Sequence, residues 1–366
     1  MKILITGGHL APALAFIEEY LKNNPKEEII FVGRKYINNF ERVISLEYKE
    51  IANKGIKFID LATGRLTRVI NWRSIINFLY IPLGFFNAYK IINEEKPDFI
   101  LSFGGYIALP LSIVGFFKKI PVFTHEQTIK PGLASRIIGL FAKKIFVSFP
   151  ESIEYFDKKK TVVIGNPIKE AVLKVIKKPF DIKKDRPVIY VTGGSLGSHS
   201  INVHIGKILE DLLKKYIVIH QTGETKQYQD YDKLKKIKAK NYFLRKHFYS
   251  DEIGYIYQTC DLVIARAGAN TFFELLYLKK PTIFIPLPWS ANKEQLFHAQ
   301  IFKKYGIGEI FNQNDKSYNL KLLIDKMIGN IENYKKNFYR LKNNYQQLAS
   351  KNASQLLVRE IKKQIQ

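Results

Sequence analysis

Apolar residues along the chain form short continuous runs that are separated by longer amphipathic segments. In the first half these runs predict seven strands, at Lys2–Thr6, Glu28–Val32, Lys57–Asp60, Asp98–Phe103, Pro121–Thr124, Lys144–Ser148 and Thr161–Ile164. The second half repeats the pattern at Pro187–Thr192, Tyr216–His220, Asn241–Arg245, Asp261–Ala265 and Pro281–Ile285. Amphipathic segments such as Pro12–Asn23 lie between most of them and predict helices. Apolar strands that alternate with helices indicate parallel, doubly wound sheets.

Because the pattern occurs twice, we expect an α/β protein with two Rossmann-like domains. The break falls at Gly165-Asn166-Pro167, and the lysine-rich stretch Lys174–Lys184 follows it. The predicted domains are residues 1–164 and 165–340, with a C-terminal helix in 341–366 that packs back on the first domain. Ligands of this architecture bind at the carboxyl ends of the strands, so we expect a ligand cleft there.

Glycine clusters follow four of the predicted strands. They lie at Gly7-Gly8, Gly104-Gly105, Gly193-Gly194-Ser195-Leu196-Gly197 and Gly268, which is followed by Ala269-Asn270-Thr271. Glycine lets the backbone turn tightly, and the following helix N-terminus favours an anion. One such turn has a steric explanation; four at matching places favour a phosphate-binding cleft. Neither G-x-G-x-x-G with a following acidic strand end nor G-x-x-x-x-G-K-[ST] occurs, which argues against a nicotinamide enzyme or a P-loop kinase.

Composition narrows the class of protein. The single cysteine, Cys260, excludes a disulfide framework and fits a reducing compartment. The start of the chain runs directly into a strand and not into a signal peptide, and the longest apolar stretches are too short to span a membrane. The net charge of +25 attracts phosphates. Lysine, asparagine and isoleucine are all abundant, however, so compositional bias explains the charge equally well.

Several motifs together resemble the MurG family of N-acetylglucosaminyltransferases. They are Pro12-Ala13-Leu14-Ala15, Gly104-Gly105-Tyr106, His125-Glu126-Gln127, Gly165-Asn166-Pro167, Gly193-Gly194-Ser195-Leu196-Gly197 and Arg266-Ala267-Gly268-Ala269-Asn270-Thr271-Phe272-Phe273-Glu274. Their order and spacing match the family across almost the whole chain. The resemblance implies a GT-B fold and inverting transfer of N-acetylglucosamine from UDP-N-acetylglucosamine to the undecaprenyl-pyrophosphoryl-muramyl-pentapeptide, which converts lipid I to lipid II. It implies no tightly bound cofactor, and we predict no metal site.

The resemblance places the donor site in the second domain. Glu274 would accept hydrogen bonds from the ribose hydroxyls, and Gln295 would read the sugar hydroxyls. The remaining implied donor residues are Gly194, Ser195, Ile253, Ala269, Asn270, Thr271, Asn166 and Lys169. Phe248 and Ile253 match the stretch that flanks uracil, although core packing explains both equally well. His298 stands where the family usually has asparagine, and its role stays open.

The resemblance places the acceptor on the first domain. His9 is the candidate general base, because it stands at a helix start beside glycines and imidazole titrates near neutral pH. Glu126 is the rival base, or it orients its neighbours. The implied acceptor residues are Gly8, Gly105, Tyr106, His125, Thr128 and Asn202.

Basic and aromatic residues are interleaved in Gly64–Ile92. Arg65, Arg68, Arg73 and Lys90 accompany Trp72, Phe78, Tyr80, Phe85 and Phe86. This combination is typical of a surface that binds anionic lipid, and in the MurG family the region receives the lipid-linked acceptor. We therefore expect a peripheral protein at the cytoplasmic face of the membrane. An ordinary buried helix with long charged ends remains the alternative.

Three departures from the family concern the acceptor side or the hinge. The first glycine loop has only Gly7 and Gly8, Thr128 replaces an asparagine, and Lys169 replaces an arginine whose bidentate fork lysine cannot reproduce. A related transferase with another lipid acceptor is therefore the nearest rival, and a UDP-N-acetylglucosamine epimerase is the rival from another class. Asp230-Tyr231-Asp232 imitates a metal motif but lies in a lysine-rich surface stretch. No specific nucleic-acid partner is expected, because no recognised binding module occurs.

Overall fold

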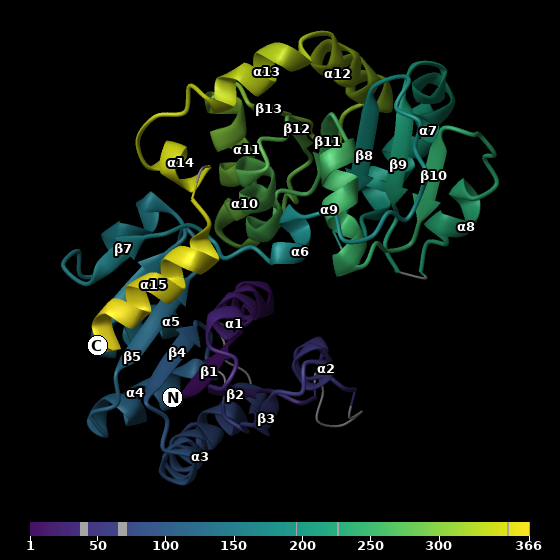
Figure 1. Cartoon of the computed structure of the whole chain (residues 1–366). Helices are drawn as coiled ribbons and strands as arrows, with labels where there is room; N and C mark the ends of the chain where they lie inside the picture. Colours follow the sequence, from purple (N-terminus) through teal and green to yellow (C-terminus); the bar gives the residue numbers. More distant parts are fainter. Residues whose placement is uncertain (37–42, 65–71, 195, 225–226, 350, 366) are drawn as a thin grey trace. The chain divides into compact units, whose positions relative to one another are not determined.

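The computed structural model describes residues 1–36, 43–64, 72–194, 196–224, 227–349 and 351–365, without the side chains of residues 72–79 and 343–344. The chain forms two compact units (Figure 1). The first comprises Met1–Lys169 and Asn352–Gln366, and the second comprises Glu170–Lys351. The first crossing between the units therefore comes a few residues after the predicted break at Gly165.

The first unit is built on a seven-stranded parallel sheet. Its strands are β1 (Lys2–Gly7), β2 (Glu28–Gly33), β3 (Lys57–Asp60), β4 (Phe99–Phe103), β5 (Val122–Glu126), β6 (Lys144–Val147) and β7 (Thr161–Val163). They are ordered β3-β2-β1-β4-β5-β6-β7. Among the described residues of this unit, the helices that accompany the sheet are α1 (Leu10–Asn23), α2 (Leu46–Asn53), α3 (Trp72–Glu95), α4 (Ala108–Phe117), α5 (Leu133–Phe141) and α15 (Ala353–Ile365), with a 3₁₀ turn η1 (Pro150–Tyr155).

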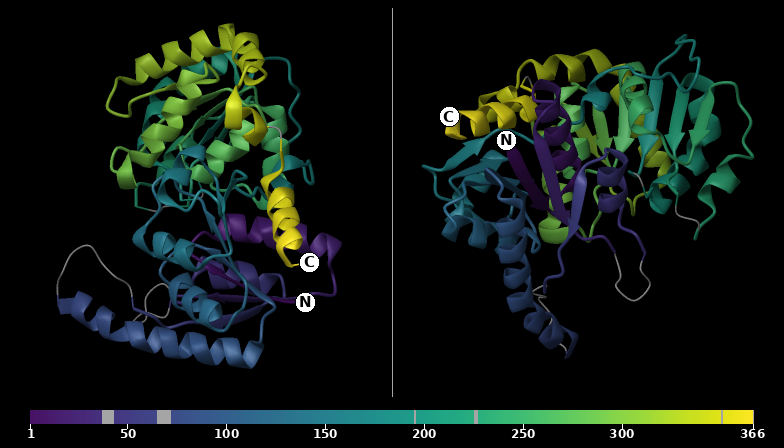
Figure 2. Two further views of the ribbon diagram at one scale, coloured as in Figure 1. Left: turned by 90° about the vertical axis from the view of Figure 1, so that its left-hand side faces the viewer. Right: turned by 60° about the horizontal axis from the view of Figure 1, so that its bottom comes forward.

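Alternate side chains of the strands supply two cores on opposite faces of this sheet. Ile3 and Ile5 belong to the core that α1 and α15 cover, whereas Leu4 belongs to the core that α3 and α4 cover. Helix α4 packs between α3 and α5. Figure 2 shows α3 as a long helix along one side of the unit.

Helix α15 completes the first unit although it comes last in the chain. It packs beside α1, as Figures 1 and 2 both show. Leu357 and Ile361 are fully buried there in the same core as Phe16. The second unit extends to Lys351 and thus past residue 340, because α14 (Asn343–Leu348) packs on α10 (Ala269–Tyr277) of that unit and the ring centres of Tyr345 and Tyr305 lie 5.5 Å apart.

The second unit contains a six-stranded parallel sheet ordered β10-β9-β8-β11-β12-β13. Its strands are β8 (Val188–Thr192), β9 (Ile217–Gln221), β10 (Tyr242–Arg245), β11 (Leu262–Ala265), β12 (Thr282–Phe284) and β13 (Gly308–Ile310). The sequence pattern missed β13, since this strand has only three residues and includes a glycine and a glutamate.

The helices of the second unit cover both faces of its sheet. They are α6 (Glu170–Leu173), α7 (His199–Lys215), α8 (Asp230–Leu234), α9 (Ser250–Thr259), α10 (Ala269–Tyr277), α11 (Glu294–Lys304), α12 (Ser317–Gly329), α13 (Ile331–Phe338) and α14, with a 3₁₀ turn at Ala291–Lys293. Ile189 and Val191 of β8 pack with α7 and α12. Tyr190, between them in sequence, packs against Tyr257 of α9 on the other face.

Both sheets have the strand order of a doubly wound fold, and the prediction of two Rossmann-like units is confirmed. In such a sheet the strand order reverses at one position, the switch point. Ligands bind at the carboxyl ends of the strands beside it. That position lies between β1 and β4 in the first unit and between β8 and β11 in the second. Each of the four glycine clusters lies at the carboxyl end of one of these four strands or within three residues after it.

No helix in the described part of the chain is both long and apolar enough to cross a bilayer.

Candidate functional site

The glycine turns after β1 and β4 are held together by their backbones. The N–H of Gly8 donates to the carbonyl of Gly104 over 3.0 Å. A Cβ atom added to Gly7 would lie 2.6 Å from the carbonyl carbon of Phe103, so no side chain fits there. Gly104 and Gly105 have φ angles of +71° and +85°, which glycine adopts readily. The first unit thus presents one fixed double turn at its switch point.

His9 stands between this double turn and α1, for which it is the N-cap residue. Its Nδ1–H donates to the carbonyl of Phe103 over 2.9 Å. A carbonyl only accepts, so this bond places the proton of the neutral ring on Nδ1 and leaves the lone pair on Nε2. A general base needs such an unprotonated nitrogen, held by a second group. The position of His9 therefore suits the role of base.

Glu126 ends β5 and is buried. Its Oε1 accepts from both the backbone N–H and the hydroxyl of Thr128, each over 2.8 Å. A Cβ atom added to Gly104 would lie 3.8 Å from Oε2 of Glu126 and 3.7 Å from Nδ1 of His9. The hydroxyl oxygen of Ser135 lies closer still, at 2.9 Å, so the two candidate bases approach the same position beside Gly104 and a larger residue there would be crowded.

His125 is fully buried one residue before Glu126. Its Nε2–H donates to the carbonyl of Gly165 over 3.1 Å, and burial lowers its pKa to about 4. The ring is therefore neutral at physiological pH and ties β5 to the turn at Gly165. Tyr106 is half-buried and packs against the core under α3 and α4. The structure thus gives both residues a packing role within the first unit.

Asn166 and Lys169 belong to the first unit, just before the chain enters the second. Asn166 is buried. The ammonium of Lys169 lies 3.9 Å from a carboxylate oxygen of Glu50 on α2. The ion pair anchors the end of this segment to the first unit.

The glycine turn after β8 makes close backbone contacts with the turn after β9. A Cβ atom added to Gly197 would lie 2.0 Å from the carbonyl oxygen of Thr222, and one added to Gly223 would lie 2.2 Å from Cα of Gly197. Gly194 has a φ of +86°. Ser195, a predicted phosphate contact, lies outside the described residues. The backbones of the two turns therefore pack directly on each other, and a side chain would fit at neither Gly197 nor Gly223.

Gln221 connects this turn to the segment predicted to flank uracil, a role that the sequence pattern did not reveal. Its Nε2–H donates to the carbonyl of Gly194 over 3.0 Å, while its Oε1 accepts from the backbone N–H of Phe248 over 3.0 Å. Phe248 is buried, and Ile253 is partly exposed on α9. A polar residue at the end of an apolar strand was the available signal.

Helix α10 begins at the switch point of the second unit. Gly268 is its N-cap, and Ala269, Asn270 and Thr271 form its first turn, where backbone N–H groups point toward an incoming anion. Glu274 follows on the same helix and is partly exposed. Its Oε2 accepts a hydrogen bond from the hydroxyl of Tyr257 over 3.0 Å. The helix therefore has an N-terminus suited to an anion and a carboxylate held by a hydrogen bond.

Helix α11 contributes Gln295 and His298. Oε1 of Gln295 accepts a hydrogen bond from the backbone N–H of Leu287 over 3.0 Å. If Gln295 contacts a sugar hydroxyl, the amide nitrogen would therefore be the donor. The Nδ1–H of His298 donates to the carbonyl of Ala267 over 2.8 Å, and burial lowers the pKa of this histidine to about 4. His298 thereby holds the loop that leads into α10.

Arg266 is a second residue whose role emerged only from the structure. One guanidinium nitrogen lies 2.8 to 2.9 Å from the hydroxyls of Ser198 and Ser200 and from Oε1 of Gln313, and these three acceptors share its two N–H groups. Burial lowers its pKa to about 10, so the group remains charged at neutral pH. Since these acceptors are neutral, the arginine places positive charge beside the turn after β11, where a diphosphate would carry negative charge.

Asn202 lies in the interior of the second unit. Its amide donates to the carbonyl of Thr222 over 3.0 Å and to Asp230 over 2.8 Å, and its Oδ1 accepts from the ring of His220 over 3.0 Å. Asp230, from the metal-like motif, also bonds His199 over 2.8 Å. The residue predicted to meet the acceptor therefore supports the turn that packs on Gly197.

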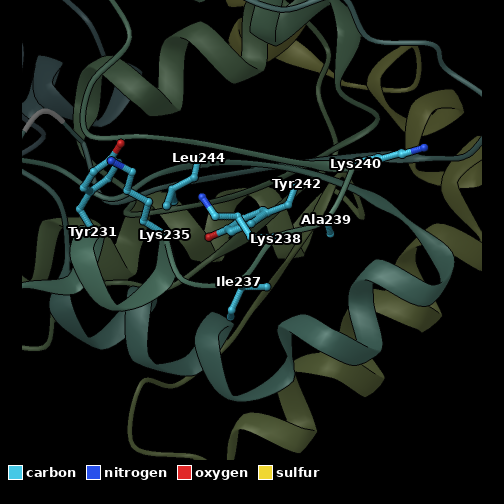
Figure 3. A pocket seen from close by; sticks show the side chains of 8 residues that line it. All are labelled: Tyr231, Lys235, Ile237, Lys238, Ala239, Lys240, Tyr242 and Leu244. Carbon is cyan, nitrogen blue, oxygen red and sulfur yellow. The ribbon is translucent and has the colours of Figure 1, made fainter.

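A separate hollow of about 480 Å³ lies along the edge strand β10 (Figure 3). Three lysines, two tyrosines and three apolar residues line it: Lys235, Lys238, Lys240, Tyr231, Tyr242, Ile237, Ala239 and Leu244. None of these residues belongs to the glycine turns or to α10 and α11. The hollow is thus distinct from the residues grouped at the switch point.

Sequence comparisons match both units to one enzyme family. The glycosyltransferase family 28 N-terminal domain matches residues 6–147, and the family 28 C-terminal domain matches residues 188–357. A Clostridium novyi protein named UDP-N-acetylglucosamine--N-acetylmuramyl-(pentapeptide) pyrophosphoryl-undecaprenol N-acetylglucosamine transferase is 33% identical over 92% of this chain and 99% of its own length. The Clostridium tetani protein of the same name is 31% identical over 93% of each chain.

Solved structures show the same fold. Acinetobacter baumannii MurG superposes with a TM-score of 0.71 at 21% identity, covering 99% of each chain. The UDP-GlcNAc 2-epimerase from Neisseria meningitidis superposes with a TM-score of 0.65 at 17% identity, covering 99% of this chain and all of the other. These likenesses confirm the predicted GT-B class.

Proposed function

The chain belongs to the MurG family of N-acetylglucosaminyltransferases, within glycosyltransferase family 28, and from this premise we propose that it converts lipid I to lipid II. The reaction transfers N-acetylglucosamine from UDP-N-acetylglucosamine to the undecaprenyl-pyrophosphoryl-muramyl-pentapeptide. The observation that carries the proposal is the set of groups at the switch point of the second unit, where the start of α10, Glu274 and Gln295 suit the diphosphate, the ribose and the sugar of a UDP-sugar.

The second unit supplies the donor site of this proposal. The N-terminus of α10 receives the diphosphate, and the charge of Arg266 stabilises it as the leaving group departs. Glu274 accepts from the ribose hydroxyls, and the amide nitrogen of Gln295 donates to the sugar. Ile253, which is partly exposed on α9, flanks the uracil.

The first unit binds the acceptor and supplies the general base. The acceptor hydroxyl oxygen forms a bond to the anomeric carbon of N-acetylglucosamine, while the bond from that carbon to the UDP oxygen breaks. The hydroxyl proton passes to Nε2 of His9, because Nδ1 is engaged by the carbonyl of Phe103. Attack opposite to the leaving group inverts the anomeric carbon. Glu126 lies near the same position and holds Thr128 through Oε1.

The membrane contact is part of the same proposal. Aromatic and aliphatic side chains are exposed on three neighbouring helices of the first unit: Tyr80, Leu83, Phe86 and Tyr89 on α3, Phe116 and Phe117 at the end of α4, and Leu133 and Leu140 on α5. Lys118 lies 4.2 Å from the ring centre of Tyr89, which adds basic charge to this surface. Apolar side chains bordered by cations suit an anionic bilayer, and we place the enzyme at its cytoplasmic face.

The described patch is broader than the predicted segment Gly64–Ile92, since it includes the ends of α4 and α5. Residues 65–71, with Arg65 and Arg68, lie outside the described part, and no side chain is described for Trp72, Arg73 or Phe78. The support therefore comes from α3 after residue 79 and from its two neighbours.

The decisive experiment is transfer of radiolabelled N-acetylglucosamine from its UDP conjugate to a lipid I analogue, with a control that lacks acceptor. Product that forms only with acceptor supports the proposal. Epimerisation without acceptor would support the epimerase, which at present rests on a likeness of fold alone. Donor binding without transfer to lipid I would favour another lipid acceptor. Running the assay with and without EDTA tests our proposal that no divalent cation is required.

A further inference from the structure

Tyr257 makes the hydrogen bond that holds the candidate ribose carboxylate. It lies on α9, one helical turn after Ile253 and on the same face of the helix. The side chain is almost fully buried, and its hydroxyl donates to Oε2 of Glu274 over 3.0 Å. The bond joins α9, which carries the proposed uracil-flanking residue Ile253, to α10, which carries the proposed diphosphate-binding turn.

The direction of this bond is fixed by the surroundings of the phenol. Burial, together with the nearby Glu274 carboxylate, raises the pKa of Tyr257 well above its usual range. The phenol therefore keeps its proton and donates, and the carboxylate accepts. The ring of Tyr190 meets that of Tyr257 edge-on, with centres 5.7 Å apart and planes at 81°. Packing on this ring leaves the hydroxyl little freedom to move.

On the basis of the proposed function, we propose that Tyr257 positions Glu274 for the paired hydroxyls of the ribose. Tyr257 thereby sets the preference of the site for a ribonucleotide over a deoxyribonucleotide. A carboxylate that accepts from two neighbouring hydroxyls must hold a defined orientation, because rotation about its last bond misaligns both contacts. With Oε2 fixed by Tyr257, the plane of the whole carboxylate is fixed. Tyr257 would act in this way without touching the nucleotide.

The test compares binding of UDP and 2′-deoxy-UDP by calorimetry in the wild type and in Tyr257→Phe. The substitution removes one oxygen and retains the aromatic packing. We expect the wild type to prefer UDP by about tenfold or more, as the loss of a hydrogen bond to a charged group implies. In Y257F the preference should shrink to about threefold or less, through weaker binding of UDP with little change for the deoxy form.

Tyr190→Phe is the matched control, because it removes another buried hydroxyl of the same aromatic pair while leaving the Tyr257–Glu274 bond in place. It should preserve the preference for UDP. A double-mutant cycle combines Y257F with Glu274→Ala. Once the carboxylate is absent, adding Y257F should leave the UDP affinity unchanged. A purely structural role for Tyr257 would instead lower the affinity for both nucleotides equally and in both backgrounds.

An unchanged preference for UDP in Y257F would overturn the inference, and so would a further loss of UDP affinity in the double variant. A wild type that binds UDP and deoxy-UDP equally would overturn it as well, together with the ribose role of Glu274. Failure of the proposed function has a different signature, namely no saturable binding of UDP or UDP-N-acetylglucosamine by the wild type.

Discussion

Replacing His298 by leucine removes the hydrogen bond that holds the loop before α10. The bond joins Nδ1–H of His298 to the carbonyl of Ala267 over 2.8 Å, and Ala267 is fully buried. Water therefore cannot replace the lost donor, and an unsatisfied buried acceptor costs ~1–3 kcal/mol. Since burial lowers the pKa of His298 to about 4, the bond at pH 7 joins neutral groups, which favours the lower half of that range.

For a domain of this size, each kcal/mol shifts the unfolding midpoint by ~2–4 °C, so we expect H298L to lower it by ~2–8 °C. Scanning calorimetry at pH 7 measures the shift. His298→Asn is the matched control, because the asparagine amide offers a donor close to the position of Nδ1 in a smaller side chain. H298N should retain most of the stability that H298L loses.

The reasoning would be refuted if H298L were as stable as the wild type, or if H298N lost as much as H298L. The second result would assign the stabilisation to packing of the imidazole on Phe272, whose ring centre lies 5.2 Å away.

Four further changes test other parts of the proposal. His9→Ala should lower kcat by ~10²–10⁴-fold, as expected for a lost general base, with little change in the donor KM; near-normal turnover would transfer the role to Glu126. Glu274→Ala should raise the KM for UDP-N-acetylglucosamine by the equivalent of ~1–3 kcal/mol, and an unchanged KM would remove this carboxylate from the site. Burial raises the pKa of Glu47 from 4.5 to about 7 in the folded protein, so the unfolded chain ionises first and stability falls as pH rises between these values. Glu47→Gln should therefore gain stability over the wild type at pH 8 but not at pH 4 in urea unfolding, and a constant difference would contradict the assignment. Phe117→Glu should weaken co-sedimentation with anionic vesicles by about tenfold or more, given the ~1.5–3 kcal/mol that burial of an apolar side chain contributes, while leaving UDP binding intact; equal sedimentation would exclude this residue from the membrane surface.

The sequence predicted the sheets well because each strand is encoded locally. A continuous apolar run such as Pro187–Thr192 has no other stable place than the centre of a parallel sheet, and the glycines after it mark the turn. The strand order then places the four glycine turns at the two switch points. The short strand β13 lacks the apolar run, and its pairing with β12 depends on tertiary context.

The polar connections of the site could not be predicted in the same way. Gln221 bonds residues 27 positions away on both sides, and Tyr257 bonds Glu274 from a different helix. Such contacts depend on which elements become neighbours in the fold. Asn202 shows the converse, because its motif suggested a ligand contact while its surroundings engage it with Thr222, Asp230 and His220.

The return of α15 to the first unit has a consequence for synthesis of the protein on the ribosome. The second unit is one uninterrupted segment, Glu170–Lys351, whereas the first also needs Asn352–Gln366. Leu357 and Ile361 fill the core beside α1, so until they are translated that core stays open to solvent. The half of the protein that is made first is therefore the half that finishes folding last, and its apolar surface must be kept from aggregating while the other half is being made.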